Sequence, residues 1–423
     1  MKKSSVFTVT NLRRDPFRSF WVAPPQTSPL ASEQAGREVM ANPHWERLGR
    51  LTLWPLAVLA VVHTVCVRAA AGSTTDDFTT VYLATRRFWD DIPVYNEVYH
   101  HVDPHYLYNP GATLLLSPLG LSHHPGAARM LFILVGAAAI VAALVWLCDI
   151  FGVRRSSPLL PAVIFGAFLT ESVVNTLVFA NINGVLLLVF VGFIAAFQHG
   201  RNWWAGVALG LLIVVKPLFA PLLVLAVMVW RWRIVAAGVA VPLTLNALAW
   251  PLVPGAGDYL SVVVPYLGEV RDYANSSILG MGAYFGWPDW TTTVLRAVVG
   301  LAVLVAMLAL ARWRYTDQLL WLTTSSGILL AGVFVLSSLG QQYYSMMLFP
   351  MVMTIVLPKS AVANVTSWVC LAAIFSPLDW TVSAGENLGS WVTQFANTAG
   401  WSGLIVAVAA TTGVWWIHQQ RKV

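Results

Sequence analysis

Charge is what this chain has least of. Asp, Glu, Lys and Arg make up 10% of its 423 residues, whereas hydrophobic residues make up 57%. Soluble globular domains carry roughly 25% charged residues, so the composition excludes a soluble enzyme and indicates a polytopic, all-α membrane protein. The net charge of +6 is spread over many short connections and forms no single basic patch. This spread is typical of membrane topology and predicts no nucleic-acid partner.

Cysteine is also scarce, and its placement excludes two kinds of site. Cys66, Cys148 and Cys370 all lie in apolar segments without CxxC spacing. We therefore expect no disulfide framework, no zinc centre and no cofactor. The N-terminal segment 1–50 lacks the apolar run of a cleavable signal peptide. It is polar and rich in Pro and Arg, so we expect a disordered cytosolic tail.

Long apolar runs dominate the rest of the chain. A helix needs roughly 20 apolar residues to cross the hydrocarbon. Runs of this kind predict spans near 51–70, 128–148, 158–176, 182–198, 234–253, 291–311, 318–338, 344–358, 361–377 and 401–418. Two stretches are ambiguous. We interpret 203–230 as two short helices meeting at Lys216-Pro217, and 110–121 as either a short crossing or a re-entrant piece. The total predicted is about twelve spans.

Positive charge orients the spans. With the tail in the cytosol, most Lys and Arg residues of the connections fall inside, provided that 110–121 does not cross. The predicted protein is then a multi-pass protein of the cell (inner) membrane, with outer loops at 72–127 and 254–290. The polar clusters of the chain lie at span ends on this outer side. A transporter would place them near the midplane and often shows inverted repeats; the pattern therefore favours a surface-active enzyme.

The stretch 72–111 is the most polar part of the membrane region. It contains an adjacent carboxylate pair, Asp76 and Asp77, directly after the first apolar span. A base that removes a proton from a sugar hydroxyl needs a carboxylate that is open to substrate and partly desolvated. The alternative interpretation is a helix cap, a common position for Asp.

Isolated polar residues elsewhere give further candidates. Lys216 lies in an apolar run, where lysine is costly; it is either a phosphate ligand or a snorkelling side chain. Glu171 is an acid within or near a span. Asn181 and Asn183 carry amides that suit sugar hydroxyls, with helix–helix hydrogen bonding as the alternative for amides in this region. His105 stands in HHVDPH, which is too compact for a strong metal site.

A family resemblance enters through longer motifs. Asp77-Phe78, Val81-Tyr82, Tyr95 and the run Tyr106–Gly111 resemble the first outer loop of the GT-C glycosyltransferases, which use polyprenyl-phosphate sugars. VDPHYLYNPGATLLLSPLG, NTLVFANING, VVKPLFAPLL, RDYANSSILGMGAYFG, TTSSGILL and QYYSMMLFPMVMTIVLP resemble the α-(1→3)-arabinofuranosyltransferases of actinobacterial cell-wall assembly. The resemblance covers roughly residues 50–360. It implies a GT-C transmembrane catalytic domain over 51–420, with outward-facing juxtamembrane helices in the loop 72–111.

The resemblance also implies a reaction. Arabinofuranose would pass from decaprenylphosphoryl-arabinofuranose to an arabinan acceptor, with inversion, to form α-(1→3) branches of arabinogalactan and lipoarabinomannan. Asp77 matches the loop acid and would be the general base, with Asp76 able to share or replace its role. The departing phosphate needs cationic or donor groups, for which Lys216, His105 and Arg271 are the candidates. The candidates for sugar or acceptor binding are Tyr108, Glu171, Asn181, Asn183, Asp272, Asn275, Gln342, Tyr343 and Tyr344.

Two alternatives stay open at this point. Related mannosyl enzymes carry paired histidines at the late outer turn, where this chain has Gln341-Gln342-Tyr343-Tyr344. This departure disfavours, but does not exclude, a polyprenyl-phosphomannose-dependent α-mannosyltransferase of lipoglycans. The second alternative is a lipid-linked sugar flippase. A flippase should lose little when Asp77 becomes Asn, whereas a transferase should lose turnover.

Overall fold

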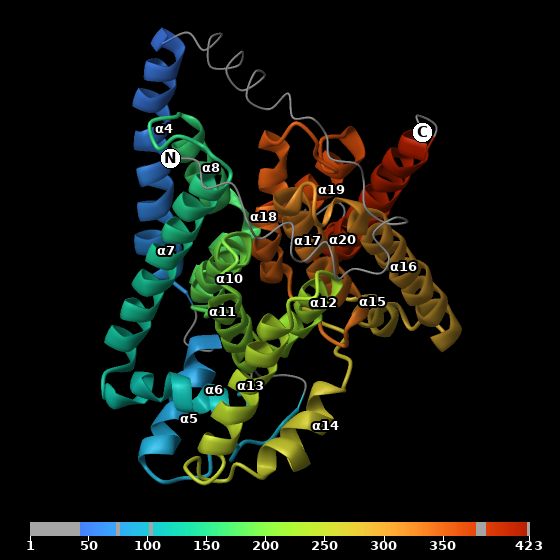
Figure 1. Ribbon diagram of the computed structural model, residues 1–423. Helices are drawn as coiled ribbons and strands as arrows, with labels where there is room; N and C mark the ends of the chain where they lie inside the picture. Colours follow the sequence, from blue (N-terminus) through green and yellow to red (C-terminus); the bar gives the residue numbers. More distant parts are fainter. Residues whose placement is uncertain (1–42, 73–76, 101–104, 378–385, 421–423) are drawn as a thin grey trace.

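The computed structural model describes residues 43–72, 77–100, 105–377 and 386–420, and every regular element in these ranges is helical (Figure 1). The elements of the first half are α4 (Pro43–His63), η1 (Thr64–Ala69), α5 (Asp77–Trp89), α6 (Pro110–Leu116), η2 (Ser117–Leu121), α7 (Pro125–Ile150), α8 (Leu159–Leu169), α9 (Glu171–Val178), α10 (Asn183–Gln198) and α11 (Asn202–Val215). α4 begins at Pro43, inside the segment predicted to be a disordered tail. The rest of that tail lies outside the described residues.

The second half continues with shorter and broken elements. They are η3 (Pro217–Leu222), α12 (Leu223–Met228), α13 (Trp232–Ala249), η4 (Tyr259–Val263), α14 (Val264–Leu267), α15 (Ile278–Phe285), α16 (Asp289–Leu310), η5 (Ala311–Trp313), α17 (Gln318–Leu336), η6 (Gln342–Leu348), α18 (Phe349–Val352), η7 (Met353–Val356), α19 (Val365–Phe375) and α20 (Glu386–Gln420). The predicted break at Lys216-Pro217 is confirmed, because α11 ends immediately before it.

Six helices in the described ranges are long and apolar enough to cross a membrane. They are His44–Ala69, Pro125–Ile150, Trp232–Ala249, Asp289–Trp313, Gln318–Leu336 and Trp391–His418. A seventh span arises if α8 and α9 count together, but these helices meet at 62°. The span predicted over 158–176 is therefore two helices with a sharp bend between them, and its crossing of the membrane stays a prediction. Thr170 caps α9 with its hydroxyl and so starts a new helix inside the apolar run.

Several other predicted spans are shorter or less regular than expected. Asn183–Gln198, Asn202–Val215, Pro217–Met228 and Val365–Phe375 are apolar but short. The span predicted over 344–358 is a succession of 3₁₀ and single-turn α segments, η6, α18 and η7. The total of about twelve spans thus stays a prediction.

The segment 110–121, which forms α6 and η2, lies at one end of the bundle (Figure 1). At one end of the bundle, Arg50 near the start of α4 donates to the Ser156 carbonyl beyond the end of α7 (2.8 Å). At the other end, Arg129 near the start of α7 donates to the carbonyls of Ala69 (2.9 Å) and Val178 (2.7 Å). α4 and α7 are therefore antiparallel. The helices that lie between them in the sequence, α5, α6 and η2, are at the end of the bundle where η1 ends and α7 begins, the bottom in Figure 1.

A glycine pair sets how closely α7 and α10 approach. A Cβ on Gly184 would lie 2.6 Å from the Gly136 carbonyl oxygen, which only backbone movement can relieve. Gly184 follows Asn183 at the start of α10. Small residues are the usual means by which membrane helices pack closely without a hydrophobic driving force.

Replacing Gly184 by alanine should therefore destabilise the fold by about 1–3 kcal/mol through overpacking. Thermal unfolding in detergent measures the effect. Gly166→Ala in α8 is the matched control, because a Cβ there meets open space. That variant should be neutral or gain about 0.5–1 kcal/mol from the better helix propensity of alanine. Equal melting temperatures for the two variants would contradict the close contact.

Candidate active site

Asp77 is the first residue of α5, and its carboxylate is held by two side chains from distant parts of the chain. Asn181 donates through Nδ2 to Asp77 Oδ2 (2.7 Å), and the Tyr343 hydroxyl donates to the same oxygen (3.0 Å). The other oxygen, Oδ1, has no hydrogen-bond partner among the described residues. Asp77 thus has one oxygen fixed and one open to an incoming group. Asp76 lies outside the described residues.

The loop after α9 aims Asn181 at this carboxylate. Ala180 takes a φ of +45°, a left-handed conformation that is uncommon outside glycine and costs roughly 1–2 kcal/mol. The Asn181 N–H then returns to the Thr176 carbonyl (2.8 Å) and closes the turn. The Phe78 N–H also donates to the Phe179 carbonyl (3.4 Å). A strained backbone of this kind at a polar cluster is typical of functional sites.

Lys216 lies on the other side of Asn181. Its Nζ donates to Asn183 Oδ1 (2.8 Å) and to Asn181 Oδ1 (3.2 Å). Lysine only donates and an ionised carboxylate only accepts, so the two partners fix which way the Asn181 amide points. Asp77, Asn181 and Lys216 thus form one chain of charge-assisted hydrogen bonds.

The Lys216 ammonium is enclosed. The residue is 8% exposed, and its Nζ lies 4.8 Å from the centre of the Tyr344 ring and 5.7 Å from that of Tyr343. Asn183 is 1% exposed, and its Nδ2 is buried without a hydrogen-bond partner. A buried donor without a partner is costly in a finished structure. The site therefore offers an anion two donors, the ammonium and this amide.

Tyr108 completes the wall of the site. Burial, together with the nearby Asp77 charge, raises the pKa of the Tyr108 phenol well above its usual value, so its hydroxyl stays protonated. The adjacent Asn109 caps α6 and donates to the Val214 carbonyl at the end of α11 (2.6 Å). Asn246 on α13 accepts from the Gly111 N–H (3.0 Å). These bonds fix the loop carrying Tyr108 to the helix that presents Lys216.

His105 belongs to a second cluster. Glu97 pairs with Arg87 (2.5 Å) and lies 3.5 Å from His105 Nδ1, while His105 Nε2 contacts the His100 carbonyl (2.8 Å). The Tyr266 hydroxyl also donates to that carbonyl (3.0 Å), which joins the loop to α14. Both ring nitrogens of His105 are thus engaged within this cluster. This arrangement gives His105 a loop-holding role, and no hydrogen bond within the described part of the chain joins it to Asp77 or Lys216.

The side chains of Asn275 and Gln342 bind backbone groups of segments that are distant in the sequence. The Asn275 amide accepts from the N–H groups of Ser277 (3.1 Å) and Gly340 (2.9 Å) and donates to the carbonyls of Arg271 (3.0 Å) and Ser338 (2.8 Å). All its hydrogen-bonding capacity is used, so it has none left for a sugar. Gln342 Nε2 donates to the Thr393 carbonyl (2.7 Å) and ties η6 to α20.

The remaining candidates lie around the site without joining it. Arg271 stacks over Tyr273 at 5.3 Å and is near enough to Tyr344 to interact with its phenol electrostatically. The Asp272 carbonyl accepts from Gln394 (3.1 Å). Glu171, at the first turn of α9, is bonded by Asn175 on the same helix, and its Oε2 is buried without a partner. α9 runs from Glu171 toward the Asn181 turn, so Glu171 lies at the end of this helix remote from Asp77.

Sequence reasoning missed the residues that position the site. Asn109, Asn246 and Arg129 were not singled out, although each bonds backbone groups far away in the chain. Asn109 precedes Pro110, an N-cap followed by proline at the first helical position, and this signal was readable. The amide of Asn246 gave no such signal inside an apolar helix.

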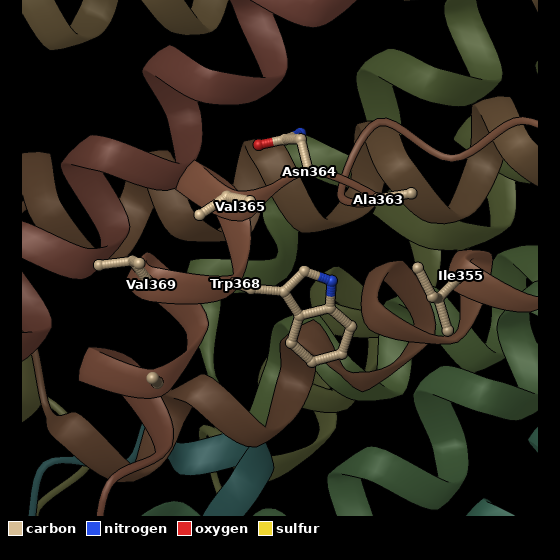
Figure 2. A pocket seen from close by; sticks show the side chains of 7 residues that line it. Ile355, Ala363, Asn364, Val365, Trp368 and Val369 are labelled. Atoms are coloured by element: carbon tan, nitrogen blue, oxygen red, sulfur yellow. The ribbon is translucent and has the colours of Figure 1, made fainter.

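A shallow apolar pocket lies away from Asp77, where the end of η7 meets α19 (Figure 2). Its lining is Ile355, Ala363, Asn364, Val365, Trp368, Val369 and Ala372. Asn364 caps α19 and donates to the Ala361 carbonyl (2.9 Å), so its amide is already used. Nothing in this lining suits sugar chemistry. In the described part of the chain, no group of three or more His, Cys, Asp or Glu residues has metal-site geometry.

Comparison with known proteins identifies the family of the chain. The model of glycosyltransferase family 87 matches residues 106–338. A protein of Corynebacterium glutamicum named alpha-(1->3)-arabinofuranosyltransferase is 47% identical over 377 residues, which is 89% of this chain and 90% of the relative. Proteins of the same name from Mycobacterium tuberculosis H37Rv and Mycolicibacterium smegmatis are each 43% identical, over 84% and 85% of this chain and 83% and 84% of their own lengths. This membrane-spanning chain therefore belongs to glycosyltransferase family 87.

Proposed function

We propose that the protein transfers arabinofuranose from decaprenylphosphoryl-arabinofuranose to an arabinan acceptor and forms α-(1→3) linkages of arabinogalactan and lipoarabinomannan. The name shared by relatives that align over most of the chain supports the sugar and the linkage. The main observation behind the proposed chemistry is the Asp77 carboxylate, whose Oδ2 accepts from Asn181. The same Asn181 amide accepts from the buried Lys216 ammonium. We propose residues 51–420 as the single catalytic domain.

Asp77 is the proposed general base. Its Oδ2 is fixed by Asn181 and Tyr343, so Oδ1 has a defined direction in which to accept a hydroxyl proton. A base held in one geometry contributes through positioning as well as proton transfer. Asp76 follows the first span in the same loop and stays a candidate to share this role.

Lys216 and Asn183 are the proposed ligands of the donor phosphate. The Lys216 ammonium and the unpartnered Asn183 Nδ2 lie together at the first turn of α10. Buried donors aimed at a group that gains negative charge stabilise it strongly, since water does not compete. The same pair would also keep the phosphate charge apart from Asp77.

The step balances as a single displacement. Asp77 takes the proton of the acceptor hydroxyl, and that oxygen forms a bond to the anomeric carbon. The bond from the anomeric carbon to the phosphate oxygen breaks on the opposite face, and its electron pair leaves with decaprenyl phosphate. A β-linked donor therefore gives an α-linked product. Phosphate is a good leaving group and needs stabilising donors more than a strong acid.

The Asp77 end is proposed to face the periplasm or cell exterior. Glu46 and Arg154 pair at the opposite end (3.2 Å), and Arg201, Arg231, Arg312, Arg314 and Lys359 belong to connections at that end. Excess Lys and Arg in short connections marks the cytoplasmic side.

The test uses purified protein in vesicles with synthetic polyprenyl-phospho-arabinofuranose and a short arabinan acceptor. We expect a single new α-(1→3) linkage, identified by linkage analysis, and no transfer when polyprenyl-phosphomannose replaces the donor. Transfer from the mannosyl donor alone would replace this proposal by a mannosyltransferase. Movement of the intact donor across the bilayer without any product would replace it by a flippase.

A further inference from the structure

A group of buried cationic side chains lies at the end of the bundle opposite Asp77. Arg231 precedes α13 and is 8% exposed, and its guanidinium stacks 4.3 Å from the centre of the Phe197 ring while donating to the Phe197 carbonyl at the end of α10. Arg231 also interacts electrostatically with Tyr315, over whose ring Arg314 stacks at 5.0 Å. The turns before α13 and α17 and the end of α10 thus form one cationic cluster.

Donors in this cluster lack acceptors. The Nε of Arg231 is buried without a hydrogen-bond partner, and so is Nε2 of Gln198, the residue that follows Phe197. Arg312, three residues before Tyr315, is also 8% exposed with Nε and Nη1 buried without partners, but its guanidinium lies over the Trp416 ring of α20 (6.0 Å). No carboxylate in the described ranges forms a salt bridge with Arg231 or Arg312.

Such an arrangement is costly unless an anion completes it. A buried charge without a counter-ion is among the most expensive features of a protein. A snorkelling arginine avoids the cost by reaching water, but burial of Arg231 excludes that solution here. The preceding Trp230 takes a φ of +57°, so the backbone is strained where it delivers Arg231 to the cluster.

The position of the cluster indicates which anion it meets. Four exposed tryptophans flank the cluster: Trp203 and Trp204 in the first turn of α11, Trp230 between α12 and α13, and Trp232 at the start of α13. Exposed tryptophans gather at the level of lipid headgroups. The phosphates of a bilayer lie at that level, and a guanidinium fork matches phosphate geometry. Basic pockets between helices on the cytoplasmic side are suited to anionic headgroups.

We propose that Arg231, with Gln198, binds the phosphate of an anionic phospholipid headgroup at the end of the molecule opposite the proposed active site. The inference does not rest on the proposed transfer reaction. The experiment measures lipid retention, so its result is independent of any glycosyltransferase assay.

The full-length protein is reconstituted in vesicles of equal phosphatidylglycerol and phosphatidylcholine and re-extracted, and the retained lipids are quantified by mass spectrometry. Phosphatidylglycerol should be enriched in the wild type. Arg231→Gln should reduce the enrichment about 10- to 100-fold, the effect of losing charge-assisted hydrogen bonds. The control is Arg233→Gln, which removes the same charge two residues further along the chain, at an exposed position in α13, and should keep the enrichment.

One further variant and one further measurement complete the test. Arg231→Lys retains the charge but loses Nε, so it reports on the site if Arg231→Gln fails to fold; its enrichment should also fall. Thermal unfolding with inorganic phosphate in place of lipid separates a headgroup from a free anion. Equal retention of the two lipids, equal losses in the Arg231 and Arg233 variants, or equal protection by inorganic phosphate would each overturn the proposal.

Discussion

Asp77→Asn should lower the turnover number by about 10²- to 10⁴-fold, the usual contribution of a positioned general base. Asparagine has the same shape, and its oxygen can still accept from Asn181 and Tyr343 as Asp77 Oδ2 does. The fold and the donor site should therefore survive. What is lost is the ability to take a proton at the position of Oδ1, so the effect should appear in kcat while donor binding changes little.

The measurement is the initial rate of arabinofuranosyl transfer, with donor binding determined separately on the same preparation. Asp90→Asn is the matched control, because Asp90 is an exposed acid just beyond the end of α5 and pairs with Arg86 (3.0 Å). That variant should stay within about twofold of the wild type, as a surface ion pair contributes little. If Asp77→Asn stays active and Asp76→Asn does not, the base is Asp76.

Lys216→Met should give the second large loss. Removing one preorganised donor from a developing negative charge typically costs about 10²- to 10³-fold in kcat. The Michaelis constant for the donor should rise as well, because the phosphate is already charged in the ground state. The substitution leaves the Asn183 amide oxygen without a donor, at a cost of about 1–3 kcal/mol, whereas Asn181 Oδ1 still accepts from the Asn183 N–H (3.0 Å). The melting temperature should therefore fall too.

Two further variants distinguish a loss of stability from a loss of catalysis in Lys216→Met. Lys359→Met removes a lysine near Trp313 and Trp415, at the end opposite Asp77, and should leave the transfer rate unchanged. Lys216→Arg keeps the charge but not the point geometry, so it should fold better than Lys216→Met and remain slow. Wild-type turnover in a folded Lys216→Met protein would remove Lys216 from the phosphate site.

The predictions that were correct are those that depend on single residues or on short stretches of sequence. Transfer of apolar residues from water depends on each side chain, so the membrane class was readable directly from composition. Proline removes a helix N–H wherever it stands, so the break at Lys216-Pro217 was readable too. The bend within the span predicted over 158–176 was missed because hydropathy averages over Thr170, whereas one capping hydroxyl suffices to begin a new helix.

Roles within the polar set depended on distant partners. Asn181 and Asn275 are both amides in turns between helices, and both were predicted to bind sugar. Asn181 donates to Asp77, 104 positions away in the sequence. The amide of Asn275 forms all its hydrogen bonds with backbone groups instead. His105 and Lys216 were both predicted at the phosphate, and packing placed His105 with Glu97 instead.

The sequence by itself determined the membrane class, the carboxylate that opens α5, the lysine at the proline break and the family resemblance, because each is carried by residue types and short spacings. Only the tertiary structure decided that Asp77, Asn181 and Lys216 form one hydrogen-bonded chain and that 110–121 lies at the end of the bundle where η1 ends and α7 begins. Hydropathy and motifs measure what a residue prefers. Which of its possible partners satisfies a polar group depends on how helices far apart in the chain pack together.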